Sequence, residues 1–249
     1  MVRKIRQAVF LCIFLPFLFG GSVQALENFT VTPEIINIDA FYHGTYIAVS
    51  GYVPEDANVA VRFIGSPQEF HLKRKGKIFG LLWMNMDTVT FKGAPGTVIV
   101  YASSAELAER LGLKSLRDKI TIETESEVDR SLLFNEFLKL KKSEGLYSEN
   151  VGTISFGGAS GGNRQFFARV HLPSRLAPGH YKLQVYVLSE GKVGQVLERP
   201  IEVRLTGFPA ILAALAFNHS ALYGILATVI AVFAGLLMGF LFGGKGGSH

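Results

Sequence analysis

Four basic side chains lie close together shortly before the chain's single tryptophan: Lys73, Arg74, Lys75 and Lys77. Lysine and arginine form charge-assisted hydrogen bonds with oxyanions. Together with Trp83 and Asn85, the cluster could therefore bind a small anion, a lipid headgroup or an acidic partner. The same lysines could instead be solvated charges that protect a strand edge. We favour the solvated hairpin, keep these residues as the candidate anion or partner site, and expect Trp83 to be a buried aromatic side chain.

Two methionines, Met84 and Met86, have the spacing that places both side chains on one face of a strand, and His71 is near them in sequence. Thioether and imidazole groups are ligands that suit copper(I). Methionines on a strand more often fill gaps in a core. We therefore expect neither a metal site nor a cofactor, with copper(I) held by these three side chains as the alternative.

A formal match to the G-x-S-x-G nucleophile elbow runs from Gly158 to Gly162, with Ser160 at its centre. That elbow requires a strand before it, a helix after it, and an acid and a histidine later in the chain. The neighbouring residues here are glycine-rich and predict a loop between strands. No pair of carboxylates stands out for acid–base catalysis. We expect no catalytic residues and no enzyme activity.

The 22 residues from Ala221 to Phe242 carry no charge. At about 1.5 Å per residue, a helix of this length covers roughly 33 Å, close to the thickness of the bilayer hydrocarbon. The stretch therefore predicts a transmembrane helix in the lipid bilayer.

Small residues recur every four positions along this span: Ala227, Ala231, Gly235, Gly239 and Gly243. A stripe of small residues lets a second helix approach closely. We expect the span to pack against a copy of itself or against a helix of a membrane partner. The alternative is that glycine and alanine are simply common in membrane helices.

The first 25 residues have the pattern of a secretory signal peptide. Three basic residues precede an uncharged run from Ala8 to Gly20, and cleavage is expected after Ala25. The chain's one cysteine, Cys12, lies inside this run, so the processed chain would have no thiol for disulfides, metal binding or catalysis. The charge that remains is close to neutral and gives no indication of nucleic-acid binding.

The signal and the span together predict the topology of the chain. Residues 26–207 would form the exported domain, and residues 243–249 would form a cytoplasmic tail. The apolar segment at residues 208–220 is too short to cross a bilayer, so we expect it to lie in the interface.

Apolar residues alternate with polar ones through much of the exported domain, with Gly, Pro and Asp between the runs. This pattern predicts antiparallel strands. The segment from Leu176 to Tyr181 resembles the tyrosine corner of immunoglobulin-like sandwiches. We therefore expect a mainly β fold, an immunoglobulin-like antiparallel β-sandwich.

Between about residues 103 and 145, the apolar residues recur with the spacing of a helix. Ser103 is expected to begin one helix, and Ser126 with Asp129 to begin a second. Neither apolar stripe is large enough to form a core alone. The prediction is a two-helix insertion in the sandwich, followed by one C-terminal transmembrane helix.

Seven segments carry a resemblance to a known family: Lys73–Lys75, Gly80–Asn85, Ser103–Ser104, Gly145–Tyr147, Phe167–Pro173, Pro178–Tyr181 and Leu222–Gly224. They are similar to the Alph_Pro_TM family of alphaproteobacterial transmembrane proteins. The family defines no catalytic residue. Its members are often encoded beside permeases of the TauE/SafE sulfite exporter type, which implies an accessory subunit of the bacterial inner membrane that faces the periplasm.

Two functions from different classes therefore stay open. The first is a non-enzymatic, inner-membrane-anchored protein that serves as an accessory or interaction subunit of a membrane permease of the sulfite exporter type. The alternative is a periplasmic binder of a small anion or copper(I), which would use the basic cluster or the two methionines.

Overall fold

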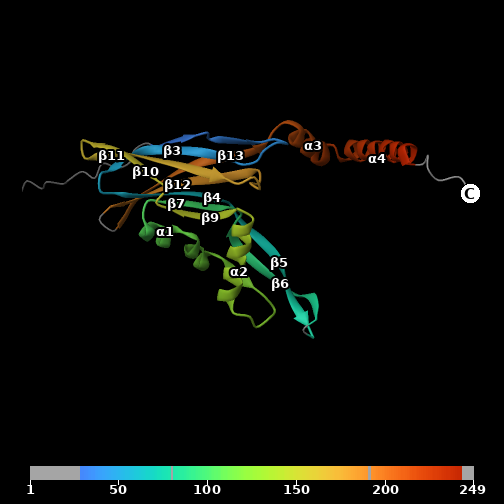
Figure 1. Ribbon diagram of the computed structural model, residues 1–249, viewed down its shortest axis with the longest axis horizontal. Helices are drawn as coiled ribbons and strands as arrows, with labels where there is room; N and C mark the ends of the chain where they lie inside the picture. The colour runs from blue at the N-terminus through green and yellow to red at the C-terminus, as the bar shows by residue number, and fades with distance from the viewer. Residues whose placement is uncertain (1–28, 80, 190–191, 243–249) are drawn as a thin grey trace, which may run out of the picture.

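The computed structural model describes residues 29–79, 81–189 and 192–242, and its body is a sandwich of two β-sheets (Figure 1). The predicted signal peptide at residues 1–25 and the predicted tail at residues 243–249 lie outside this part of the chain. The first sheet has the strand order β1-β3-β11-β10 and is antiparallel throughout. Its strands are β1 (Phe29–Thr32), β3 (Thr45–Pro54), β10 (Ser155–Ser160) and β11 (Asn163–Leu172).

The second sheet has the order β2-β13-β12-β4-β7-β9. Its strands are β2 (Ile35–Ile38), β4 (Asn58–Gly65), β7 (Val98–Ala102), β9 (Tyr147–Val151), β12 (Gly179–Ser189) and β13 (Lys192–Leu205). The inner pairs are antiparallel, whereas the edge strands β2 and β9 run parallel to their neighbours. The predicted sandwich is therefore confirmed, with two parallel edges that the sequence did not indicate.

The core lies between the two sheets and is filled by one face of each strand. On β11 the residues alternate between buried and exposed from Phe166 onward, which is the period expected of a half-buried strand. On β12 the ring of Tyr181 stacks on Phe63, with the ring centroids 4.8 Å apart. The Tyr181 hydroxyl donates to the carbonyl of Ala177 at 2.8 Å. This is the hydrogen bond of a tyrosine corner, so the immunoglobulin-like prediction is confirmed.

The helical insertion lies between β7 and β9 and covers the outer face of the second sheet (Figure 1). It contains α1 (Ala105–Leu111), the 3-10 helix η1 (Leu113–Lys119), the short strand β8 (Thr121–Glu123) and α2 (Arg130–Ser143). The two helices were predicted, and η1 and β8 were not. Because α1 packs on Tyr186 and Leu188, the outer face of β12 is also buried.

The first helix begins one residue later than predicted. Ser104 caps α1, since its hydroxyl oxygen accepts from the Leu107 amide at 3.4 Å. Ser103 instead accepts from the amide of Val59 and so ties the end of β7 to β4. The second helix also begins later than the predicted start at Ser126, because Asp129 caps α2 and its side chain accepts from the Ser131 amide.

A long hairpin formed by β5 (Pro67–Ile78) and β6 (Leu82–Pro95) leaves the sandwich and makes a third sheet with β8. The base of the hairpin packs on α2, where Phe91 stacks on Phe137 with ring centroids 4.4 Å apart. This contact belongs to a second hydrophobic core that also includes residues of η1 and β7. The hairpin therefore supplies an apolar partner for α2, whereas α1 packs on the second sheet.

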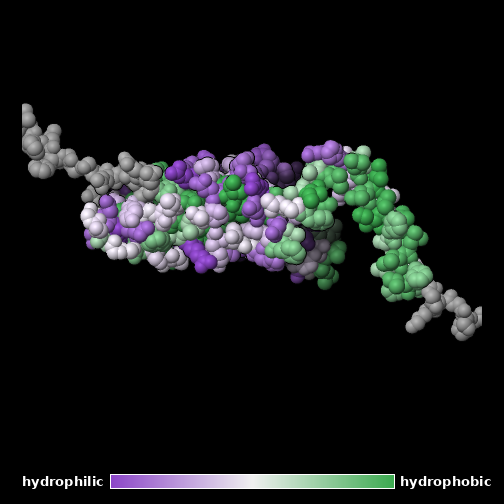
Figure 2. Space-filling model, turned by 90° about the horizontal axis from the view of Figure 1, so that it is seen from above, coloured by the Kyte–Doolittle hydropathy of each residue, from purple (hydrophilic) through white to green (hydrophobic). Residues whose placement is uncertain are grey.

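Beyond β13 the chain forms α3 (Gly207–Asn218) and α4 (Ser220–Phe242), which are separated by His219. Within the described ranges, α4 is the one helix long and apolar enough to cross a membrane. None of its side chains is buried against the rest of the described chain. Figure 2 shows α3 and α4 as a hydrophobic arm that extends from the domain.

Candidate functional site

The side chains of the predicted basic cluster lie on two opposite faces of the hairpin. Three lysines lie on the exposed face, opposite the one that Phe70 and Leu72 turn toward α2: Lys73, Lys75 and Lys77. On β6, Asn85 pairs with Lys75 and Trp83 pairs with Lys77, so both belong to that same exposed face. The structure therefore brings together all of the candidate cluster except Arg74.

Arg74 lies on the other face and is held by the protein itself. Its Nε is 2.6 Å from Oδ1 of Asp87, and its Nη2 donates to the Ser126 hydroxyl at 3.3 Å. The Asp87 side chain is 7% exposed, and Thr124 donates to its second oxygen at 3.0 Å. Hydrogen bonds from Ser126, Arg74 and Thr124, together with the charge of Arg74, hold the pKa of Asp87 below its ordinary value. Arg74 is thus a structural residue of the hairpin, because Asp87 and Ser126 hold its Nε and Nη2.

Trp83 is exposed, so the expectation that it is buried is wrong. It keeps 64% of its accessible surface. The ammonium of Lys77 lies 5.2 Å from the centroid of its ring, a distance typical of a cation–π contact. The end of the hairpin extends past α2 (Figure 1), in agreement with the exposure of the ring.

The end of the hairpin carries a group of exposed apolar side chains, which we call the apolar tip: Phe79, Leu81, Leu82, Trp83, Met84 and Met86. Phe79 and Leu81 are the most open, at 95% and 89% exposed. An uncovered apolar group of this kind commonly marks a surface that meets a protein or a membrane. The sequence does not predict the apolar tip, because a short apolar run on a strand equally suits a buried strand.

The membrane helix α4 carries the predicted stripe of small residues along one side: Ala227, Ala231, Gly235 and Gly239. Gly243, the last residue of the predicted stripe, lies outside the described residues. A Cβ atom added to Gly235 or Gly239 would meet nothing within 4 Å apart from its own helix. This side of the span is therefore open to a helix from another chain.

Comparison with known proteins places the chain in a family. Residues 28–243 match Alph_Pro_TM, which is described as "Putative transmembrane protein". The chain belongs to the Alph_Pro_TM family. No curated protein matches it. Among solved structures, the Alph_Pro_TM chain is similar to murine CRIg at 8% identity and a TM-score of 0.26, over 72% of this chain and 99% of that one. The family description and the exposed apolar helix α4 together identify a membrane protein.

The Alph_Pro_TM structure separates His71 from the two methionines of the copper(I) alternative. Met84 pairs with Gly76 near the tip, whereas His71 pairs with Thr90. Five residues along β5 correspond to about 17 Å. The ring of His71 is moreover 3.0 Å from the Thr90 hydroxyl. His71 therefore does not share a site with Met84, so the predicted three-ligand set is not assembled.

The G-x-S-x-G segment of the Alph_Pro_TM chain forms a hairpin turn. Ser160 is the last residue of β10 and pairs with Asn163 at the start of β11. A strand therefore follows where a nucleophile elbow requires a helix. The serine is exposed and lacks the backbone arrangement of that motif.

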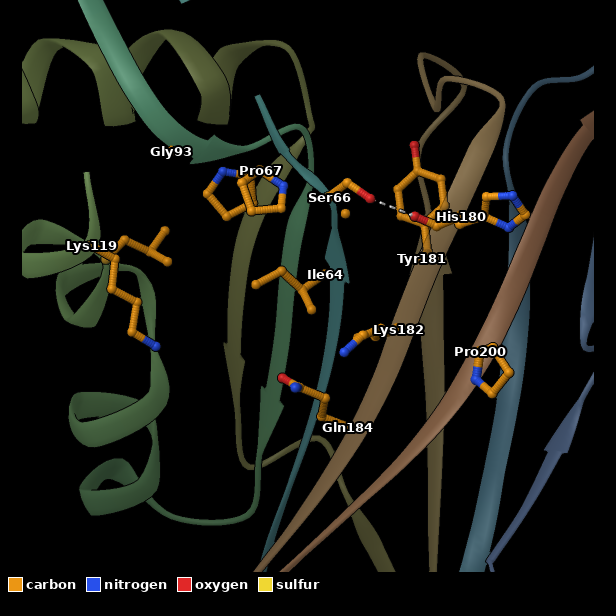
Figure 3. Close-up of a pocket in the computed structure, with 13 residues that line it drawn as sticks. Ile64, Ser66, Pro67, Gly93, Lys119, His180, Tyr181, Lys182, Gln184 and Pro200 are labelled. Carbon is orange, nitrogen blue, oxygen red and sulfur yellow. Dashed lines mark hydrogen bonds between the residues drawn. The ribbon is translucent and has the colours of Figure 1, made fainter. Parts of the chain in front are cut away.

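A cleft of about 680 Å³ lies between the sandwich and the helical insertion of the Alph_Pro_TM domain (Figure 3). Its walls come from the β4–β5 junction, the end of β6, η1, β12 and β13. Lys119 and Lys182 are among the lining residues. Lys182 is paired with Glu198 at 3.1 Å, and most of the remaining lining is apolar. No local pattern in the sequence indicates this cleft, because its lining residues are far apart along the chain.

Proposed function

We propose that this Alph_Pro_TM protein is a non-enzymatic interaction subunit of a membrane permease in the bacterial inner membrane. The observation that carries the proposal is the open side of α4. Small residues line that side from Ala227 to Gly239, and no other part of the described chain packs there. Close packing is the main force between helices in lipid, so this side suits a helix of a second membrane protein.

The permease is proposed to be of the sulfite exporter type. The support is the resemblance described above, because proteins similar to this chain are often encoded beside such permeases. A permease has several spans and can offer a helix to α4. The exported sandwich would then lie beside the permease on the periplasmic side, with residues 243–249 in the cytoplasm.

The segment between the sandwich and the span fits this arrangement. The helix α3 has apolar residues around its circumference, and exposed Phe208, Ile211 and Phe217 lie along it. A helix of 12 residues is too short to cross the hydrocarbon. We propose that α3 lies in the membrane interface and keeps the sandwich close to the lipid surface.

Copurification tests the proposal. The tagged full-length chain is expressed with a sulfite-exporter-type permease, crosslinked in membranes and purified in detergent. The double substitution Gly235→Leu with Gly239→Leu should abolish recovery of the permease, because two leucines prevent close helix approach. The control, Phe233→Leu with Phe240→Leu, changes the opposite side of α4 and should leave recovery unchanged.

Two outcomes would overturn the proposal. If the glycine double variant recovers the permease as well as the native chain, the stripe is not the contact. If the native chain recovers no permease, and a membrane reporter shows self-association that the glycine variant loses, α4 binds a second copy of this chain instead.

A further inference from the structure

We infer that the apolar tip of the hairpin inserts into the membrane interface and that the adjacent lysines bind anionic phospholipid headgroups. The hairpin would then be a second membrane contact of a protein already anchored by α4. This inference depends on the membrane location of the chain and is independent of the proposed permease.

The hairpin and the membrane helix leave the sandwich from the same end. The last residue of β4, Gly65, pairs with Tyr181 at the start of β12, and the chain continues directly into β5. Gly179, the first residue of β12, pairs with Val203 near the end of β13, just before α3. The hairpin therefore starts at the membrane-proximal end. A strand of 12 residues extends about 40 Å, and Figure 1 shows the tip well beyond the sandwich.

Phe79 is an unusual residue for the turn of a hairpin. Phe79 has a φ of 51°, the left-handed region that glycine or asparagine normally occupies. A phenylalanine is costly there, and its side chain is 95% exposed, so it contributes little to the folded domain. The turn between β5 and β6 requires a positive φ, so the backbone value belongs to the hairpin. A bulky apolar side chain left uncovered at such a turn favours an apolar environment outside the protein.

The order of side chains along the hairpin matches the order of layers in a lipid leaflet. Phe79 and Leu81 are at the extreme end, Trp83 follows level with Lys77, and Lys75 and Lys73 come after them toward the base. Tryptophan prefers the headgroup level, and lysines extend toward anionic phosphates. The contact of Lys77 with the Trp83 ring joins the last two layers. A protein partner or a second copy would not require this order, and for that reason we assign the tip to lipid.

Trp83 is the single tryptophan of the chain, so intrinsic tryptophan fluorescence reports on the tip alone. The purified full-length protein is reconstituted, without any partner, into bilayers of phosphatidylcholine and phosphatidylglycerol. Bromine atoms on the acyl chains quench tryptophan at short range. We expect Trp83 to lose most of its fluorescence when dibrominated phosphatidylcholine replaces the ordinary lipid, and to be protected from aqueous iodide.

Two sets of variants test the apolar insertion and the role of the lysines separately. Phe79→Ser with Leu81→Ser should restore Trp83 fluorescence in brominated bilayers, and circular dichroism should show an intact domain, since both side chains are exposed. Changing Lys73, Lys75 and Lys77 to Gln should weaken bromine quenching only when phosphatidylglycerol is present. Changing the exposed Lys114, Lys139 and Lys142 to Gln is the matched control and should have no effect.

The inference is overturned if Trp83 fluoresces equally in brominated and ordinary bilayers while iodide quenches it. It is also overturned if Trp83 is protected from iodide without bromine quenching, because protein then covers the tip. If the Lys73, Lys75 and Lys77 variant is quenched like the native chain in every lipid mixture, the role assigned to the lysines is wrong.

Discussion

Arg74 and Asp87 face each other across the hairpin, with Nε of Arg74 2.6 Å from Oδ1 of Asp87. This pair lies next to the bulge that interrupts the strand register between Arg74 and Lys75. It also joins the hairpin to the segment ahead of α2 through Ser126. The position of the exposed tip relative to the domain therefore depends on this ion pair.

Replacing Arg74 should destabilise the protein, whereas replacing the lysine beside it should not. Arg74→Gln leaves the mostly buried Asp87 without its charged partner, so the midpoint of thermal unfolding should fall. Lys75→Gln removes an exposed charge and should change the free energy of unfolding by less than about 0.5 kcal/mol. Circular dichroism in detergent measures both. Equal midpoints for the two variants would mean that Arg74 is not structural.

The stability supplied by Asp87 should depend on pH. Its pKa in the folded protein is lower than the ordinary value of 3.8. A carboxylate with a depressed pKa stabilises the fold above its unfolded pKa, and that contribution is lost as the pH falls through the folded pKa. The native chain should therefore exceed Asp87→Asn in stability at neutral pH, and the difference should shrink below pH 3.8. Unfolding midpoints at a series of pH values test this. A constant difference would contradict it.

Truncating the tryptophan should leave the fold intact. Because Trp83 is 64% exposed, Trp83→Ala should change the free energy of unfolding by less than about 0.5 kcal/mol. Phe137→Ala should cost about 3–5 kcal/mol, since this ring is 1% exposed and stacks on Phe91. Chemical denaturation in detergent compares them. A large loss for Trp83→Ala would show that the ring is covered after all.

The tyrosine corner should contribute a measurable but small stability. Tyr181→Phe removes the hydrogen bond to the Ala177 carbonyl and should cost about 0.5–1.5 kcal/mol. Tyr52→Phe is a matched control on an exposed ring and should have no effect. Denaturant midpoints report both values. If Tyr181→Phe is neutral, the corner is not needed for the stability of the sandwich.

The topology proposed for the chain can be tested in bacterial cells. Alkaline phosphatase fused after His249 should be inactive, because it needs the periplasm to fold, and a fluorescent protein at the same position should glow. Alkaline phosphatase fused after Leu205, ahead of α3, should be active. The reverse pattern of activities would contradict an exported sandwich with a cytoplasmic C-terminus.

Local patterns in the sequence were sufficient for the sandwich, the helical insertion and the membrane helix. The alternation on β11 and the uncharged run of α4 each arise from neighbours in sequence. The Leu176–Tyr181 segment predicted the tyrosine corner for the same reason, since donor and acceptor are four residues apart.

Tertiary structure decided which face of each strand is buried and which is exposed. The alternation of apolar and polar residues shows that a strand has two different faces. It does not show which distant element covers each face. The outer face of β12 is buried because α1 lies on Tyr186, and Trp83 is open because the hairpin extends beyond α2. Arg74 became structural because Asp87 and Ser126, 13 and 52 residues away, meet it in space. Burial and charge pairing depend on such long-range contacts, and the order of residues along the chain does not specify them.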